Sequence, residues 1–246
     1  MSISIFFPVL VLVCSYWILC SSLGQLAHMY NIKINYTRKI GHFSMFIFPG
    51  VIYFIFNISN PTDKIIIASL SSVFFFVSLI SFFRDKLKYL SLSFRAIDRP
   101  EDRPYTLVWI FSQTFVGFVV LALFSLLWNK WNIPQELMYM TILTTTLGDG
   151  LAEPVGVRFG KHKYAVKGFF IDKTFYRSFE GSLVVYFFAL ILALFFIQNF
   201  HGVGWAMMVI LFPLAMTLTE AKSPHTWDTP FLFFVGNLII TCAYLI

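Results

Sequence analysis

Long apolar runs, separated by short polar connections, fill almost the whole chain and limit the folds it can adopt. Eight runs can be distinguished, at residues 3–23, 40–58, 64–83, 105–128, 137–158, 179–199, 203–219 and 229–246. A helix of about 20 apolar residues matches the thickness of a bilayer core, so these runs predict transmembrane helices. Only 12% of the residues are charged, about half the usual share in a soluble domain.

The sequence therefore predicts an all-α, polytopic integral membrane protein with about eight transmembrane helices. We expect a single multi-pass membrane domain over residues 1–246. Seven helices are also compatible, because run 203–219 is short and run 229–246 reaches the chain end. The first run is too long for a typical cleavable signal, and no basic residue precedes it, so we expect it to remain as a helix. The three cysteines lie inside apolar runs and predict small buried side chains rather than disulfides.

Basic residues are confined to one set of connections between the runs. The connections after the first, third, fifth and seventh runs contain every Lys and Arg except Lys64 and Lys130. Positively charged loops generally stay on the cytoplasmic side of a membrane. We therefore expect these loops to face the cytoplasm, in a bacterial inner membrane or an ER-type membrane, with both chain ends on the other side.

The fifth run ends in an acidic motif, Gly148-Asp149-Gly150-Leu151-Ala152-Glu153-Pro154. Its two glycines predict a break in the helix; if the helix resumes, Asp149 and Glu153 share one face because they are four residues apart. A charge at membrane depth is costly, which favours a functional role. Mg²⁺ usually takes one or two protein carboxylates and completes its shell with phosphate oxygens. We therefore interpret the two acids as ligands for Mg²⁺ bound to a nucleotide triphosphate. An ion pair with Arg158 or with a Lys of the following loop is the structural alternative.

A dense basic loop, residues 158–177, follows this motif. It is suited either to neutralise nucleotide phosphates or to bind anionic lipid headgroups. Its Gly156-x-x-x-Gly160-Lys161 segment lacks the spacing of a P-loop. Glu180, where the sixth run begins, binds metal, acts as a base, or simply stabilises a helix N-terminus. Glu220 and Asp228 flank the connection after the seventh run, on the same predicted membrane face.

These motifs resemble the CTP-dependent membrane lipid-kinase family, which contains dolichol kinases, phytol and farnesol kinases and the fungal-type diacylglycerol kinase. The resemblance has a specific central block at residues 148–182 and weaker outer pieces, and it spans most of residues 38–230. The matching pieces are Arg38-Lys39-x-x-His42, Gly148 to Gly156, Phe159-Gly160-Lys161-His162-Lys163, Lys173-Thr174, Arg177-Ser178-Phe179-Glu180-Gly181-Ser182, Glu220 and Asp228. Two positions depart from the family pattern. Thr229 follows Asp228 where the family often has Asn, and Arg177 replaces the Lys before Ser-x-Glu-Gly-Ser.

The resemblance implies an enzyme that transfers the γ-phosphoryl group of CTP to a lipid alcohol, with Mg²⁺ as cofactor. The acceptor would be a polyprenol- or phytol-type isoprenoid alcohol or diacylglycerol, and the other expected partners are membrane lipids but no nucleic acid. The implied catalytic residues are Asp149, Lys173 and Glu180, the last of which orients or deprotonates the acceptor hydroxyl. The implied metal ligands are Asp149, Glu153, Glu220 and Asp228. The implied nucleotide- and phosphate-binding residues are Lys39, Gly148, Gly150, Lys161, Lys163, Arg177, Gly181 and Ser182.

Two other functions remain as alternatives. Phosphatidate cytidylyltransferases share part of the central block, but they end in a Lys-Asp pair, a Gly-His-Gly-Gly turn and an Asp-Arg-x-Asp motif. This chain contains none of these pieces after Glu220. A transporter that uses intramembrane acids as an ion path predicts polar residues spread through several runs, whereas here they gather toward one predicted face. We therefore favour the kinase.

Overall fold

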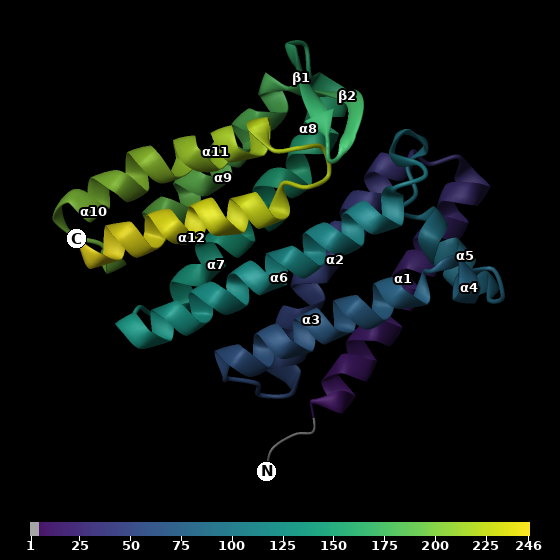
Figure 1. The fold of residues 1–246 in the computed structure, drawn as a ribbon, viewed down its shortest axis with the longest axis horizontal. Helices are drawn as coiled ribbons and strands as arrows, with labels where there is room; N and C mark the ends of the chain where they lie inside the picture. Colours follow the sequence, from purple (N-terminus) through teal and green to yellow (C-terminus); the bar gives the residue numbers. More distant parts are fainter. Residues whose placement is uncertain (1–4) are drawn as a thin grey trace. The chain divides into compact units, whose positions relative to one another are not determined.

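A computed structural model describes residues 5–246 and shows a mostly helical chain with one β-hairpin (Figure 1). The chain forms two compact units, Met1–Phe115 and Val116–Ile246, and the boundary falls inside helix α6 (Thr106–Trp131). Each unit has its own packed helices and its own buried ionic cluster. One continuous domain therefore stays a prediction.

The first unit is built around the long helix α1. Its elements are α1 (Phe6–Tyr30), α2 (Ile34–Ile55), α3 (Pro61–Ser78), α4 (Ser81–Arg84), α5 (Lys88–Arg95), η1 (Pro100–Asp102) and the first part of α6. Helix α1 packs against α2, α3 and α5, and Leu12, Tyr16 and Phe75 lie in the resulting core. Gly24 on α1 allows the closest approach to α5, because a Cβ there would overlap the carbonyl oxygen of Leu92.

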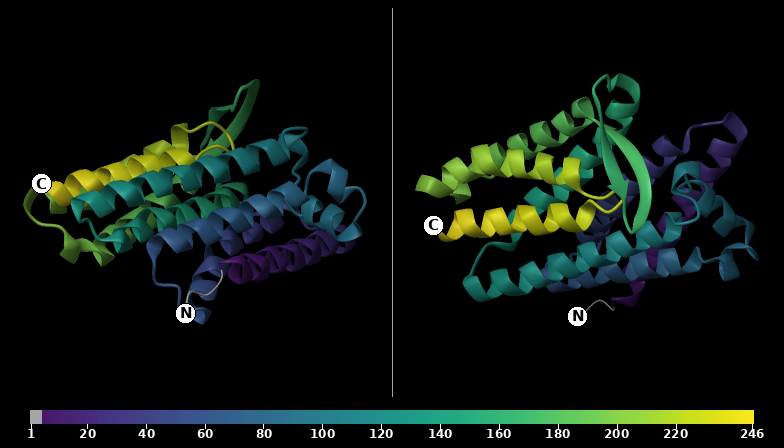
Figure 2. Two further views of the ribbon diagram at one scale, coloured as in Figure 1. Left: turned by 60° about the horizontal axis from the view of Figure 1, so that its bottom comes forward. Right: turned by 45° about the horizontal axis from the view of Figure 1, so that its top comes forward.

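The second unit carries the acidic motif and the basic loop. After α6 its elements are η2 (Gln135–Leu137), α7 (Met138–Leu143), η3 (Thr144–Asp149), α8 (Gly150–Phe159), β1 (Lys163–Gly168), β2 (Ile171–Ser178), α9 (Phe179–Phe195), η4 (Ile197–Asn199), α10 (Gly202–Ala206), η5 (Met207–Leu211), α11 (Phe212–Lys222) and α12 (Thr229–Leu245). Helix α9 packs against α8, η3 and α11, while α12 packs against α7 and α11. The β1–β2 hairpin lies across the ends of α11 and α12 (Figure 2).

In the part of the chain that the structure describes, each predicted apolar run is mostly helical, but the helices differ in their ability to cross a membrane. Within residues 5–246, four helices are both long and apolar enough to do so: α1, α3, α6 and the continuous helix Gly202–Lys222, which contains α10, η5 and α11. Helices α9 and α12 are apolar but shorter. The chain is thus a mostly helical protein with several helices that could cross a membrane. The number of spans and their sidedness stay predictions.

The prediction of an all-α fold missed a short β-hairpin in the basic loop, although the rest of the described chain is mostly helical. Strands β1 and β2 form an antiparallel pair in which Tyr164 lies opposite Arg177 and Val166 lies opposite Phe175. Exposed and less exposed residues alternate along β1, which is the pattern of a strand with one covered face. This alternation is short and involves few apolar residues, so it could not be recognised in a segment that contains many charged residues.

The predicted helix break at Gly148-Asp149-Gly150 is also wrong. Asp149 has φ −65° and ψ −38°, and Gly150 has φ −54° and ψ −41°, so both are helical. The helix instead widens into π-helical turns over Thr144–Asp149 and continues as α8. Gly148 serves packing rather than bending, because a Cβ there would lie 3.1 Å from the Cα of Val185 on α9. Single π-helical turns of this kind are frequent at functional sites.

Candidate functional site

A buried ionic cluster lies in the second unit, beneath the β-hairpin. Arg177 on β2 places Nη1 3.3 Å from Oε1 of Glu220 on α11, and its Nη2 donates to Oδ2 of Asp228 at 3.1 Å. Asp228 directly precedes α12. Glu220 is 4% exposed and Asp228 9% exposed. We refer to Arg177, Glu220, Asp228 and the nearby Asp149 as the Arg177 cluster.

Asp149 joins this cluster through its charge. It ends the π-helical segment η3 and is 7% exposed. Burial lowers the pKa of Arg177, but the carboxylates of Glu220, Asp228 and Asp149 outweigh this effect and raise that pKa above its ordinary value. Asp149 and Asp228 also lie within electrostatic range of Glu220. One guanidinium group therefore interacts electrostatically with three carboxylates, which come from η3, α11 and the start of α12.

A chain of hydrogen bonds connects Glu220 to the first strand of the hairpin. Ser182 Oγ, in the first turns of α9, donates to Glu220 Oε2 at 2.8 Å. The hydroxyl oxygen of Tyr164 lies 2.6 Å from the same Ser182 Oγ. A serine has a single hydroxyl proton, and Ser182 gives it to Glu220, so Tyr164 donates to Ser182. The two carboxylate oxygens of Glu220 are thus held by different groups, Oε1 by Arg177 and Oε2 by Ser182.

Strand alternation divides the basic loop into two faces. Arg177 and Tyr164 are directly opposed and share the face that meets the helices. By the same alternation Lys173 belongs to this face, whereas Lys163 and Lys167 are exposed on the opposite one. The loop is therefore not one continuous phosphate-binding surface. Of the implied phosphate contacts in the strands, Arg177 faces the acids and Lys163 faces away from them.

Aromatic stacking fixes the hairpin over the connection between α11 and α12. The ring of Phe175 stacks on His225 with centroids 3.7 Å apart, and Phe169 stacks on Trp227 at 4.2 Å. His225 and Trp227 belong to the connection that ends in Asp228. The face of the hairpin that bears Arg177 is thereby held beside one of the carboxylates it pairs with.

Glu180 lies outside the Arg177 cluster. Its Oε1 is 2.8 Å from Nδ1 of His162 and accepts from the backbone N–H of the same residue at 3.3 Å. Glu180 also occupies the first turn of α9, where a carboxylate interacts favourably with the helix dipole. These contacts fit a surface cap of the helix. The catalytic role implied by the family resemblance stays a prediction.

Three other implied ligands are spread over the chain. Glu153 lies on α8, one helical turn beyond Asp149, and is partly exposed. Lys161 is exposed in the link between α8 and β1. Lys39 belongs to α2 in the first unit. Their contacts with metal or nucleotide stay predictions.

The implied nucleotide-binding glycines lie within helices, and two of them, Gly148 and Gly181, have packing roles. Gly181 lets α9 cross α8 closely, since a Cβ there would lie 2.7 Å from the carbonyl oxygen of Ala152. Gly148 serves the packing of η3 on α9 in the same way. Gly150 is buried at the start of α8. Close helix packing therefore explains Gly148 and Gly181 without any ligand.

The carboxylates of the Arg177 cluster are the type of oxygen ligand that Mg²⁺ prefers. Within residues 5–246, however, no group of three or more His, Cys, Asp and Glu side chains is arranged to hold a metal ion by itself. The Arg177 guanidinium pairs with two of the carboxylates at 3.1 and 3.3 Å. The donor set therefore fits an ion held by one or two carboxylates together with phosphate oxygens. It does not fit a cage made of protein alone.

Two contributions to the site were missed by reasoning from sequence. Tyr164 was not identified, and Arg177 was expected to contact phosphate rather than to pair with Glu220 and Asp228. The alternation of residues along β1 and β2 is the signal that could have found Tyr164, because it predicts a hairpin with Tyr164 opposite Arg177. Comparisons of the chain with known protein families, with curated proteins and with solved structures found no match.

Proposed function

We propose that the Arg177 cluster is the catalytic centre of a CTP-dependent lipid-alcohol kinase. The acceptor is a polyprenol- or phytol-type isoprenoid alcohol or diacylglycerol. The observation that carries this proposal is the convergence of Asp149, Glu220 and Asp228 on one buried guanidinium at the ends of apolar helices. Phosphoryl transfer requires acids that hold a metal ion and cations that neutralise phosphate, and this cluster supplies both.

Each member of the cluster has a role in this proposal. Mg²⁺, when bound, neutralises the charge that develops on the transferred phosphoryl group. One or two of the carboxylates of Asp149, Glu220 and Asp228 would hold the ion together with phosphate oxygens. Arg177 Nη1 lies 3.3 Å from Glu220 Oε1 in an ion pair without hydrogen-bond geometry, and it would donate to a phosphate oxygen once a metal ion neutralises the acids. Lys173, on the same face of the hairpin, extends the cationic side of the site.

Arg177 has a second role when no nucleotide is present. A buried carboxylate without a counter-charge is strongly destabilising, and the guanidinium provides that counter-charge to Glu220 and Asp228. Phosphate can take over the guanidinium only when a metal ion arrives with it to neutralise the acids. The cluster therefore favours the metal–nucleotide complex over either component alone.

The location of the cluster suits a lipid acceptor. The alcohol lies in the bilayer with its hydroxyl at the interface, while the nucleotide arrives from water. Helix ends and the fixed hairpin hold the two reactants in line, and positioning of this kind lowers the barrier without covalent chemistry.

One observation favours the transporter alternative. Polar side chains are buried between α7, α12 and α6, where Thr141 Oγ1 donates to Asn237 Oδ1 at 2.9 Å and Trp128 Nε1 donates to Thr241 Oγ1 at 2.7 Å. A Cβ on Gly236 would overlap the side chain of Thr141. However, this seam is tightly packed and is typical of hydrogen-bonded contacts between membrane helices, so we keep the transporter as the second candidate.

Product analysis tests the proposal. Purified protein is incubated with Mg²⁺, each labelled nucleoside triphosphate in turn, and either a panel of lipid alcohols or phosphatidate; the products are separated by thin-layer chromatography. Phosphorylated alcohol and CDP support the kinase. A CDP-lipid with pyrophosphate supports the cytidylyltransferase, and ion flux in proteoliposomes without nucleotide supports the transporter.

A further inference from the structure

Tyr164 is the outermost member of the hydrogen-bond chain that ends on Glu220. The tyrosine is partly buried, whereas Ser182 and Glu220 are almost completely enclosed. The donors point in one direction, from Tyr164 to Ser182 at 2.6 Å and from Ser182 to Glu220 at 2.8 Å. The hydroxyl group of a residue on the hairpin thus reaches the Glu220 carboxylate through Ser182.

The hairpin holds both oxygens of the Glu220 carboxylate through a single pair of opposed residues. Arg177 contacts Oε1 directly, and Tyr164 acts on Oε2 through Ser182. Tyr164 and Arg177 are direct partners in the register of β1 and β2. The rotation of the carboxylate is therefore set by the register of the hairpin, and support of this kind fixes the orientation of groups that bind ligands.

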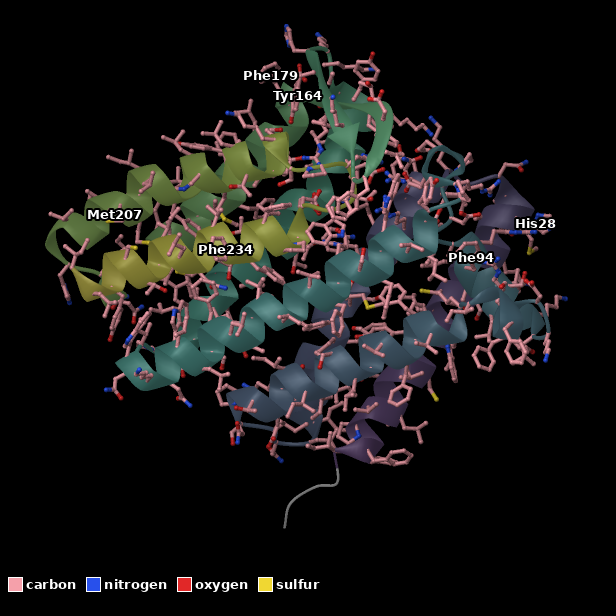
Figure 3. All side chains as sticks on the ribbon, in the orientation of Figure 1. His28, Phe94, Tyr164, Phe179, Met207 and Phe234 are labelled. Carbon is pink, nitrogen blue, oxygen red and sulfur yellow. The ribbon has the colours of Figure 1, made fainter. Side chains whose placement is uncertain are left out.

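The ring of Tyr164 is held independently of its hydroxyl group. It packs beside Phe179 with centroids 5.2 Å apart, and Figure 3 shows the two labelled residues next to each other at the base of the hairpin. Burial and the negative charge of Glu220 raise the pKa of Tyr164 above its ordinary value. The hydroxyl group therefore keeps its proton at neutral pH and remains a donor.

We propose that Tyr164 is a positioning residue of this site, which acts through Ser182 to orient the Glu220 carboxylate toward the metal–nucleotide complex. The inference rests on the proposed kinase function. It assigns Tyr164 to the binding of the nucleotide side of the reaction and not to the binding of the lipid. Loss of its hydroxyl group should accordingly weaken the binding of Mg·CTP and leave the binding of the lipid alcohol unchanged.

Tyr164→Phe is the variant that tests this assignment. It keeps the ring contact with Phe179 and removes only the hydroxyl group. The KM for Mg·CTP should rise about tenfold, as is typical when a residue that orients a metal ligand is lost, while the KM for the lipid alcohol and the thermal unfolding midpoint stay unchanged. Tyr176→Phe is the matched control, because Tyr176 lies on the other face of the same hairpin and is 71% exposed. Wild-type kinetics in Tyr164→Phe, or an equal rise in both KM values, would overturn the inference.

A double-mutant cycle shows whether Tyr164 acts through Ser182. Ser182→Ala should reproduce the effect of Tyr164→Phe, and Tyr164→Phe should add nothing in the Ser182→Ala background. Ser182→Thr keeps the hydroxyl group and should restore the wild-type KM for Mg·CTP. Additive losses, or no restoration by threonine, would contradict the inference.

Calorimetric binding of Mg·CTP separates this inference from the proposed function. If the effects of Tyr164→Phe and Ser182→Ala on the Kd for Mg·CTP are non-additive but no alcohol is turned over, the positioning role is supported and the kinase is rejected. Turnover of an alcohol with additive effects in the cycle would support the kinase and reject the positioning role.

Discussion

The two units each bury one ionic cluster, and the two clusters are built in opposite ways. In the first unit one carboxylate serves two guanidinium groups: Arg99 Nε donates to Asp102 Oδ2 at 2.8 Å, and Arg38 Nη1 lies 3.6 Å from the same oxygen. In the second unit one guanidinium, Arg177, serves three carboxylates. Asp102 is 0% exposed, so both clusters are deeply buried and burial does not distinguish them.

The origin of the contacts distinguishes the two clusters. Arg99 and Asp102 are three residues apart in one turn, and the neighbouring pair of Arg103 and Asp98 is also local, with Nε 2.8 Å from Oδ2. Arg177 instead contacts Asp228 across 51 residues, at the longer distance of 3.1 Å. Arg38 on α2 adds a contact between separate elements, 3.6 Å from Asp102 Oδ2, but the shortest pairs of the first cluster are local and fix a turn of the chain. Both ion pairs of Arg177 join separate elements, so a ligand that replaces them does not have to open a turn.

Asp102→Asn should have the largest effect, and it should be on stability. Removal of one partner leaves buried guanidinium groups uncompensated, which costs about 3 kcal/mol of unfolding free energy. Turnover per folded molecule should not change, because this cluster holds a turn and α2 together and contains none of the residues of the Arg177 cluster. The measurement is unfolding of the protein in detergent, followed alongside specific activity.

The matched control for Asp102→Asn is Glu101→Gln in the same turn. Glu101 is more exposed, and its Oε1 lies 3.9 Å from Arg99 Nε, so its loss should cost less than about 0.5 kcal/mol. A fully stable Asp102→Asn protein that has lost turnover would move the functional site to the first unit and reverse the comparison.

Asp149→Asn should lower turnover by at least a hundredfold, about 2.7 kcal/mol of transition-state stabilisation. The substitution keeps the shape of the side chain and removes the charge that joins it to the Arg177 cluster. Stability and membrane insertion should remain close to wild type, as judged by detergent unfolding and protease accessibility. Asp172→Asn on the hairpin, where the acid is exposed, is the control. Full activity in Asp149→Asn would refute the metal-binding role.

Arg177→Lys should have an intermediate effect, a decrease of about tenfold in kcat/KM for Mg·CTP, or about 1.4 kcal/mol. Lysine keeps the charge but not the fork of donors that reaches Glu220 and Asp228 together. Steady-state kinetics measure the change. Lys163→Met, on the opposite face of the hairpin, should leave the kinetics almost unchanged.

Arg177→Met sharpens the same test. Without the guanidinium the acids lack their shared counter-charge, so Mg²⁺ alone should raise the unfolding temperature of this variant, while the wild type needs Mg²⁺ together with CTP. Equal responses to Mg²⁺ in both proteins would show that Arg177 does not compete with the metal ion.

The sequence identified the helices better than it identified the site. Apolar runs of about 20 residues have few alternatives to membrane-length helices, so the segments that became α1, α3 and α6 could be located from composition. Asp149, Glu220 and Asp228 could be selected because acids at the ends of apolar runs are rare and costly. These signals are local, and each can be read within one window of the chain.

The missed features depend on contacts between distant segments. The pairing of Arg177 with Glu220 and Asp228 needs the register of the hairpin and the packing of α9 on α11, which no single window contains. Gly148 lies in a continuous helix because its function is to let Val185 on α9 pack closely, and that contact joins residues 37 positions apart. Charge composition indicated a cationic loop, but only strand pairing separates Arg177 from Lys163.

Glu180→Gln should have the smallest effect and is the most direct test of which cluster performs the chemistry. The glutamine loses the pairing with His162 and the favourable interaction with the N-terminus of α9, so stability should fall only slightly. Turnover should change by less than about threefold when it is measured in the same assay as Asp149→Asn. A decrease of a hundredfold with intact folding would instead make Glu180 the base that the family resemblance implies. The reacting hydroxyl group would then lie beside Glu180 and His162 at the surface. The Arg177 cluster would only stabilise the fold, as the ion pairs of Asp102 do in the first unit.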